Sequence, residues 1–218
     1  MDITRWFPNE VIEQIVQAAP PADRASLCRV SKLIHDLSLT ILNRTVELYE
    51  YNSAGAFCLA LIENPSRGDA IRSFSVPSAI PRERRLKRDN WHWDNWSTLE
   101  YLVTEAMKLM PRLENLVMHY LQSEPMECTF PRLATFDIAL SGTGMPRWQR
   151  LVPFLRRHPN LTRLRIKADE DITVAKGTSI SLLRLKHFDG PTTLIRSLVV
   201  RCLREARLDW CSHFHRRQ

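Results

Sequence analysis

Residues 111–118 read PRLENLVM, and the pattern returns as PRLATFDI at residues 131–138 and as PNLTRLRI at residues 159–166. All three copies follow Pro-x-Leu-x-x-[Leu/Phe]-x-[Met/Ile]. The proline ends the preceding element and the first leucine enters the core. The two later apolar residues are two positions apart, so they point the same way from a short strand. One recurring strand phrase predicts a protein built from stacked units.

Weaker copies extend this pattern toward both ends of the chain. They are Ile71 with Phe74 and Val76, Leu185 with Phe188, and Leu203 with Ala206 and Leu208. Helices are expected between the strands, at residues 98–110, 148–157 and 193–203. The predicted fold class is therefore α/β, with a short, irregular solenoid of alternating helices and parallel strands that resembles leucine-rich-repeat proteins. The usual Asn/Cys ladder is absent, so the repeats are degenerate, and an ordinary α/β domain is the alternative.

The first 48 residues have a different pattern, which predicts an all-helical unit of three short helices. Pro8 suits a first helical turn, and Pro20-Pro21 ends one helix and starts the next. Apolar residues recur on one face of the first and third helices: Val11, Ile12, Ile15, Val16 and Ala19, then Val30, Leu33, Ile34, Leu37 and Ile41. So short a segment cannot bury all these residues internally. Part of this apolar surface is expected to contact another domain or another protein.

This helical segment resembles the F-box family. Its opening, Phe7-Pro8-Asn9-Glu10-Val11-Ile12, is similar to the family's Leu-Pro-x-Glu-hydrophobic-hydrophobic start, and Val30-Ser31-Lys32 is similar to its Val-Ser/Cys-Lys helix. Phe7 replaces the usual leucine, and the family's late tryptophan is absent, as in many fungal-type members. An F-box followed by irregular leucine-rich units is similar to a large class of F-box proteins.

The resemblance implies a non-catalytic substrate-recognition subunit of a cullin RING ubiquitin ligase. Residues 1–48 would bind a Skp-type adaptor and, through it, cullin, whereas residues 49–218 would hold a protein substrate. No cofactor is implied. The implied adaptor-binding residues are Phe7, Pro8, Val11, Ile12, Ile15, Leu27, Val30 and Lys32.

Two other interpretations of the amino-terminal segment remain open: a chance amphipathic three-helix start and a helix-turn-helix DNA reader. Residues 1–48 hold five Lys/Arg against six Asp/Glu, a net charge near −1. Such a segment does not attract phosphates, so the DNA reader is disfavoured.

Composition favours a globular protein of the cytoplasm or nucleus. The chain has 218 residues, 44% of them hydrophobic and 25% charged, and a formal net charge of +7. Five cysteines without a Cys-x-x-Cys pair fit reduced thiols. The longest apolar run is too short for a bilayer and no leader is evident, so neither a membrane partner nor secretion is expected.

A basic and aromatic segment interrupts the repeats and is expected to form a surface insertion at about residues 77–97. Residues 82–96 combine an Arg/Lys run with three tryptophans. Cations beside aromatic rings can stack on single-stranded nucleic acid, which makes a nucleic-acid-binding protein the alternative function. The other interpretation is a solvated loop whose tryptophans fold back on the repeats.

No catalytic or metal-binding residue is predicted. The six glycines form no phosphate-binding loop, and there is no nucleophile elbow. Cys211, His213 and His215 are metal-ligand types, but their spacing does not match the usual zinc modules.

Strand alternation also predicts a substrate surface. Outward positions on the strands carry four cations that could receive an acidic or phosphorylated segment, Arg163, Arg165, Lys167 and Arg207. Neutralisation by Asp137 and by the acidic run at residues 169–171 is the alternative. The last strand is expected at residues 203–210 with no capping helix after it, which predicts aggregation or a longer natural product.

Overall fold

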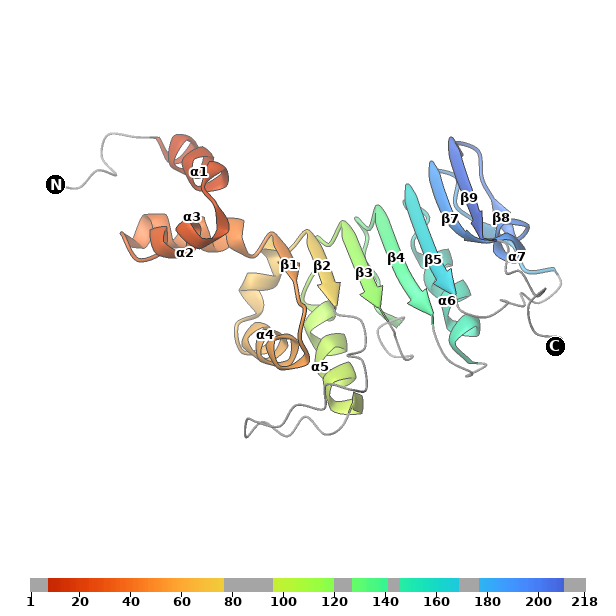
Figure 1. Ribbon diagram of the computed structural model, residues 1–218, viewed down its shortest axis with the longest axis horizontal. Helices are drawn as coiled ribbons and strands as arrows, with labels where there is room; N and C mark the ends of the chain where they lie inside the picture. The colour runs from red at the N-terminus through yellow and green to blue at the C-terminus, as the bar shows by residue number, and fades with distance from the viewer. Residues whose placement is uncertain (1–7, 77–95, 120–126, 141–145, 169–176, 210–218) are drawn as a thin grey trace, which may run out of the picture.

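The protein is a mixed α/β structure organised around one parallel sheet (Figure 1). The computed structural model describes residues 8–76, 96–119, 127–140, 146–168 and 177–209. Seven strands follow one another across the sheet in chain order, and every neighbouring pair is parallel. They are β1 (Thr45–Glu47), β2 (Ser73–Val76), β3 (Asn115–His119), β4 (Thr135–Leu140), β5 (Arg163–Ala168), β7 (His187–Pro191) and β9 (Glu205–Asp209). The mixed α/β class and the parallel strands expected from the sequence are confirmed.

The repeated phrase forms strands because its two spaced apolar residues bury the same face. In β4, Phe136 and Ile138 have no exposed surface, whereas Thr135 before them and Asp137 between them are partly exposed. The register pairs one large buried residue of each strand with a large buried residue of the next strand. In order across the sheet these residues are Phe74, Leu116, Phe136, Leu164 and Phe188. This row runs through the core from strand to strand.

A backbone ladder joins successive units where their strands begin. The Glu114 carbonyl accepts hydrogen bonds from the N–H groups of Ala134 (2.8 Å) and Thr135 (2.9 Å). The same paired bonds reach the carbonyls of Arg44, Arg72, Ala134, Thr162 and Lys186. Because a carbonyl oxygen has two lone pairs, it can accept both donors. The units therefore stack through the main chain, without the side-chain ladder that the sequence lacks.

Helices cover one face of the sheet (Figure 1). They are α4 (Tyr51–Glu63), the 3-10 helix η2 (Pro65–Ala70), α5 (Trp96–Lys108) and α6 (Pro146–Arg157). Residues of α4, α5 and α6 form one continuous core with the sheet, and the rings of Phe136 and Phe154 lie 4.7 Å apart. The helices expected at residues 98–110 and 148–157 correspond to α5 and α6, with starts two residues earlier.

The prediction of a helix at residues 193–203 is wrong. The structure has only a short helix, α7 (Thr192–Ile195), followed by β8 (Leu198–Val199), which pairs in parallel with β6 (Ile180–Ser181). The segment is rich in Thr, Ile and Val, whose branched side chains favour strands over helices. Burial of Leu194 then holds the short helix against the core.

Three helices lie at the amino-terminal end of the sheet (Figure 1). They are α1 (Asn9–Ala18), α2 (Pro21–Leu27) and α3 (Lys32–Leu42), and we call them the three-helix unit. Its small core consists of Ile12, Val16 and Ile41. Residues 1–48 were expected to be all helical, but β1 belongs to the sheet, so the sheet begins before residue 48. Contacts from α3 to β1 and η2 join the unit to the rest of the protein.

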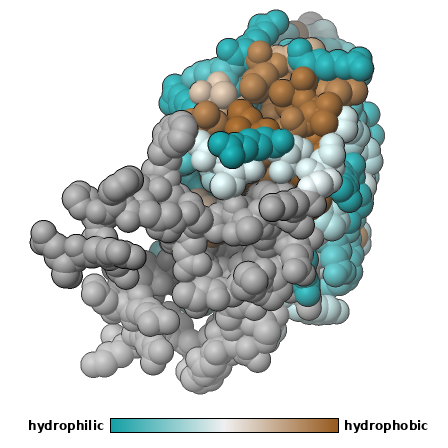
Figure 2. Space-filling model, turned by 90° about the vertical axis from the view of Figure 1, so that its right-hand side faces the viewer, coloured by the Kyte–Doolittle hydropathy of each residue, from teal (hydrophilic) through white to brown (hydrophobic). Residues whose placement is uncertain are grey.

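The carboxy-terminal end of the described sheet is strand β9. Figure 2 looks at this end and shows apolar side chains gathered beside hydrophilic ones. Leu203 and Leu208 are partly buried there, and Val199 of β8 is 47% exposed. The last strand, which was expected at residues 203–210, spans residues 205–209 in the structure. Aggregation through this edge stays a prediction.

Candidate functional site

Two surfaces of the described protein carry the residues that the sequence points to. The first is on the three-helix unit. Val11, Ile15 and Val30 are large apolar side chains that are 36%, 54% and 63% exposed. Val11 and Ile15 lie one helical turn apart on α1 and therefore share a face. We call these three exposed residues, two on α1 and one in the turn after α2, the apolar patch.

The other expected adaptor-binding residues are distributed differently. Ile12 is only 7% exposed and belongs to the core of the unit, and Leu27 packs against that core. Pro8 and Lys32 are exposed. Phe7 lies outside the described residues. Ile12 and Leu27 therefore support the helices, while the apolar patch is free to contact a partner.

Helix α2 is held against the end of α1 by one side chain. Arg24 donates a hydrogen bond from Nε to the carbonyl of Ala19 (2.7 Å) and another from its terminal nitrogen to that of Gln17 (2.6 Å). These carbonyls belong to the last turn of α1 and the residue after it, where intrahelical partners run out. The bonds fix the angle between α1 and α2 and so position the apolar patch.

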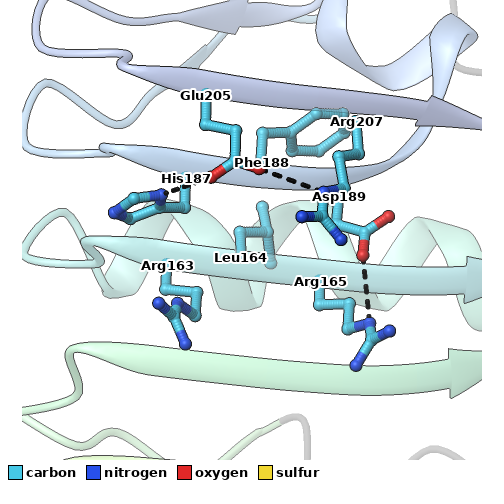
Figure 3. A pocket seen from close by; sticks show the side chains of 8 residues that line it. All are labelled: Arg163, Leu164, Arg165, His187, Phe188, Asp189, Glu205 and Arg207. Carbon is cyan, nitrogen blue, oxygen red and sulfur yellow. Dashed lines mark hydrogen bonds and ion pairs between the residues drawn. The ribbon is translucent and has the colours of Figure 1, made fainter.

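The second surface is a shallow hollow of about 230 Å³ on the sheet face away from the helices (Figure 3). Three strands line it, β5, β7 and β9. Its polar side chains are Arg163, Arg165, His187, Asp189, Glu205 and Arg207. They project from the strands because they alternate with the buried residues Leu164 and Phe188.

Charges of opposite sign alternate across this face. The register aligns Asp137, Arg165, Asp189 and Arg207 on four successive strands. The Arg165 guanidinium forms ion pairs with Asp189 (3.1 Å) and with Asp137 (3.5 Å). Two carboxylates therefore neutralise Arg165, as in the alternative interpretation of the sequence.

Glu205 pairs with two partners on the same face. It accepts hydrogen bonds from Arg207 Nε (3.0 Å) and His187 Nδ1 (3.3 Å). The bond from Arg207 and, after it, the bond from His187 lower the pKa of the Glu205 carboxyl group. Arg207 is therefore also engaged, and its charge is compensated.

The four predicted substrate-binding cations fall into two pairs, which differ in whether a described carboxylate neutralises them. Arg165 and Arg207 have carboxylate partners, whereas Arg163 and Lys167 are exposed and form no ion pair with any described residue. Sequence reasoning missed His187 and Asp189 on β7. The weak repeat at Leu185 and Phe188 could have revealed them, because it places residues 187 and 189 on the outward face.

Several predicted features lie outside the described residues. These are residues 82–95 of the basic and aromatic segment, the acidic run 169–171, and Cys211 with His213 and His215, whereas Trp96 begins α5. In the part of the chain that is described, no group of three or more His, Cys, Asp or Glu side chains could hold a metal ion. No described helix is long and apolar enough to cross a membrane.

Comparison with known proteins identifies no family for this chain. No protein-family model matches it, and no curated protein matches it. Functional inference therefore rests on the two surfaces: an apolar patch suited to a protein interface and a charged sheet face suited to polar contacts.

Proposed function

We propose that this chain is a non-catalytic substrate-recognition subunit of a cullin RING ubiquitin ligase. In this proposal the three-helix unit is an F-box that binds a Skp-type adaptor, and the sheet with its helices is a degenerate leucine-rich-repeat domain that binds a protein substrate. The chain breaks no bond itself. It raises the effective concentration of substrate lysines near the ubiquitin-conjugating enzyme.

The observation that carries this proposal is the apolar patch. Val11, Ile15 and Val30 are exposed, whereas the buried apolar residues described in the unit are Ile12, Val16 and Ile41, with Leu27, Leu33, Ile34 and Leu37 partly buried around them. Isolated exposed apolar residues are common, but two on adjacent turns of one short helix indicate a protein contact. The same helices carry the sequence resemblance to the F-box.

The repeat domain supports the substrate-binding half of the proposal by its geometry. Seven parallel strands in chain order present one row of outward side chains per strand position, and none of the described helices lies on that face (Figure 1). Such a face offers many polar contacts in a fixed register. Binding there places the substrate on the same chain as the adaptor-binding helices.

Substitution of the apolar patch tests adaptor binding. We expect Ile15→Asp and Val30→Asp to lose capture of a Skp-type adaptor, with binding weakened by about 2 kcal/mol or more, because each places a charge in an apolar interface. Both side chains are more than half exposed, so the folded chain itself should tolerate the charge. The measurement is calorimetric titration of adaptor into the purified full chain.

Tyr101→Asp is the matched control. Tyr101 lies on α5 and is 55% exposed, almost the same as Ile15 at 54%, but it is outside the three-helix unit. Its substitution should leave adaptor affinity unchanged. Full adaptor binding by a folded Ile15→Asp chain, or no binding by the wild type, would refute the proposal.

A further inference from the structure

The positive charge of the protein is concentrated in its last units. Residues 150–209 contain 13 Lys/Arg and six Asp/Glu, a net of +7, which equals the net charge of the whole chain. The remaining residues have no net charge, because they contain 18 Lys/Arg and 18 Asp/Glu. An uneven distribution of this size creates a potential that attracts anionic partners to one end of the molecule.

Repeated backbone geometry brings four of these cations, together with Arg112 and Arg132 of earlier units, to one edge of the sheet. The turns before β3, β4 and β7 each close with a backbone hydrogen bond from the N–H of one residue to the carbonyl three residues earlier, with N–O distances of 3.2, 3.1 and 3.1 Å. The residue before each of these N–H donors is an arginine, namely Arg112, Arg132 and Arg184. Lys186 and Arg204 directly precede β7 and β9, and Arg163 begins β5. Because the strands are parallel, all six lie where strands start, which we call the basic edge.

The cations of the basic edge are free of carboxylate partners. All six side chains are exposed, and none forms an ion pair with a described residue. This distinguishes the basic edge from the adjoining sheet face, where fixed carboxylates neutralise Arg165 and Arg207. The positive charge available to a partner is therefore at the strand starts and not at the centre of the sheet.

We infer that the basic edge binds an acidic polypeptide segment, and this inference rests on the proposed role of the repeat domain in holding a protein substrate. From β3 to β9 the edge spans about 19 Å at the usual strand spacing, which about six extended residues can follow. Carboxylates of such a segment accept paired hydrogen bonds from arginine guanidinium groups.

Two observations favour a polypeptide over nucleic acid. Glu205 begins β9 at the edge itself and Asp189 is the third residue of β7, and both would repel a phosphate chain that carries a negative charge at every nucleotide, whereas a polypeptide can place neutral or basic residues there. In addition, Tyr49 lies before α4 and Tyr101 lies on α5, so these two exposed aromatic side chains are not on this edge. The His187 ring does lie there, but it is hydrogen-bonded to Glu205.

Binding of a fluorescein-labelled peptide in which glutamate and glycine alternate tests the inference on the full chain. Fluorescence anisotropy should show binding that weakens as salt is added, because the cations are exposed. The variant Arg132→Glu/Arg184→Glu/Lys186→Glu should bind at least about tenfold more weakly. The control Arg29→Glu/Arg150→Glu/Arg196→Glu changes the net charge equally at exposed positions elsewhere and should bind within about twofold of the wild type.

Equal losses in the two variants would overturn the inference, since net charge alone would then explain binding. Preferential binding of a labelled single-stranded oligonucleotide, lost in the edge variant, would also overturn it in favour of nucleic acid. Adaptor capture separates this test from that of the proposed function. The edge variant should still bind the adaptor, and Ile15→Asp should still bind the peptide.

Discussion

At the scale of single residues, His158 occupies a position that other units fill with apolar side chains. It is 2% exposed and precedes Pro159, as Met110 precedes Pro111 and Phe130 precedes Pro131. Its Nε2 accepts a hydrogen bond from the Phe130 backbone N–H (2.8 Å), so its Nδ1 donates to the Phe154 carbonyl (2.7 Å). Both ring nitrogens are used, and the geometry requires the neutral ring.

Acid is expected to destabilise the protein through His158. Burial lowers its pKa below the usual 6.5, with the backbone bond to Phe154 only partly opposing this. The unfolded chain therefore takes up a proton below pH 6.5 before the folded chain does. The free energy of unfolding should fall by up to about 1.4 kcal/mol per pH unit from this group, until the pH reaches the folded-state pKa.

Urea unfolding at pH 7.5 and 5.5 measures this effect. His158→Met, which copies Met110, removes the titrating group. It should be less stable than the wild type at neutral pH by about 1–3 kcal/mol, because the Phe130 N–H loses its acceptor. Its stability should depend less on pH. The same pH dependence in wild type and His158→Met would contradict this prediction.

At the scale of elements, close contact between η2 and α5 depends on one glycine. A Cβ atom added at Gly68 would lie 1.8 Å from the Leu109 carbonyl oxygen, far inside van der Waals contact. That oxygen belongs to the main chain just after α5, so it cannot rotate away as a side chain would. The glycine therefore sets how closely η2 approaches α5, and with it the path into β2.

Gly68→Ala is expected to lower the free energy of unfolding by about 1–3 kcal/mol, the usual cost of overpacking. Chemical denaturation measures the loss. Ser66→Ala, at an exposed position of the same 3-10 helix, is the control and should change stability by less than about 0.5 kcal/mol. A Gly68→Ala protein as stable as the control would show that η2 moves away without cost.

At the scale of the whole molecule, the protein has two separate hydrophobic cores of very different size. Among the described side chains, the three-helix unit buries three apolar residues, whereas the sheet and its helices share one continuous core from Val46 to Leu194. Local stability follows the extent of burial. The three-helix unit should therefore open more readily than the sheet, even though α3 contacts β1 and η2.

Hydrogen–deuterium exchange with mass spectrometry tests this difference. Amides of α1 and α3 should exchange faster than those of β3, β4 and β5, whose buried residues form the centre of the core. Addition of a Skp-type adaptor should slow exchange in α1 and leave β4 unchanged. Equal protection of α1 and β4 in the free chain would contradict the two-core description.

Local periodicity in the sequence was sufficient to predict the strands of the seven-stranded sheet other than β1. The phrase Pro-x-Leu-x-x-[Leu/Phe]-x-[Met/Ile] placed β3, β4 and β5 correctly, because alternation of apolar and polar residues is a property of neighbouring residues. The helical stretches expected between the strands also corresponded to α5 and α6. The pattern did not predict β1 or α4, and it wrongly predicted a long helix after Pro191, where β-branched residues and pairing with β6 outweigh helical spacing.

The charges show what the sequence determined and what only the tertiary structure decided. The sequence established that Arg163, Arg165, Lys167 and Arg207 face outward, because strand alternation is local. It could not establish which of them are free, because neutralisation depends on the register between strands that are far apart in the chain. Pairing of β4, β5 and β7 brings Asp137 and Asp189 to Arg165, and stacked turns bring Arg112, Arg132 and Arg184 to one edge. Non-local register, and not residue type, decides where this protein can offer positive charge.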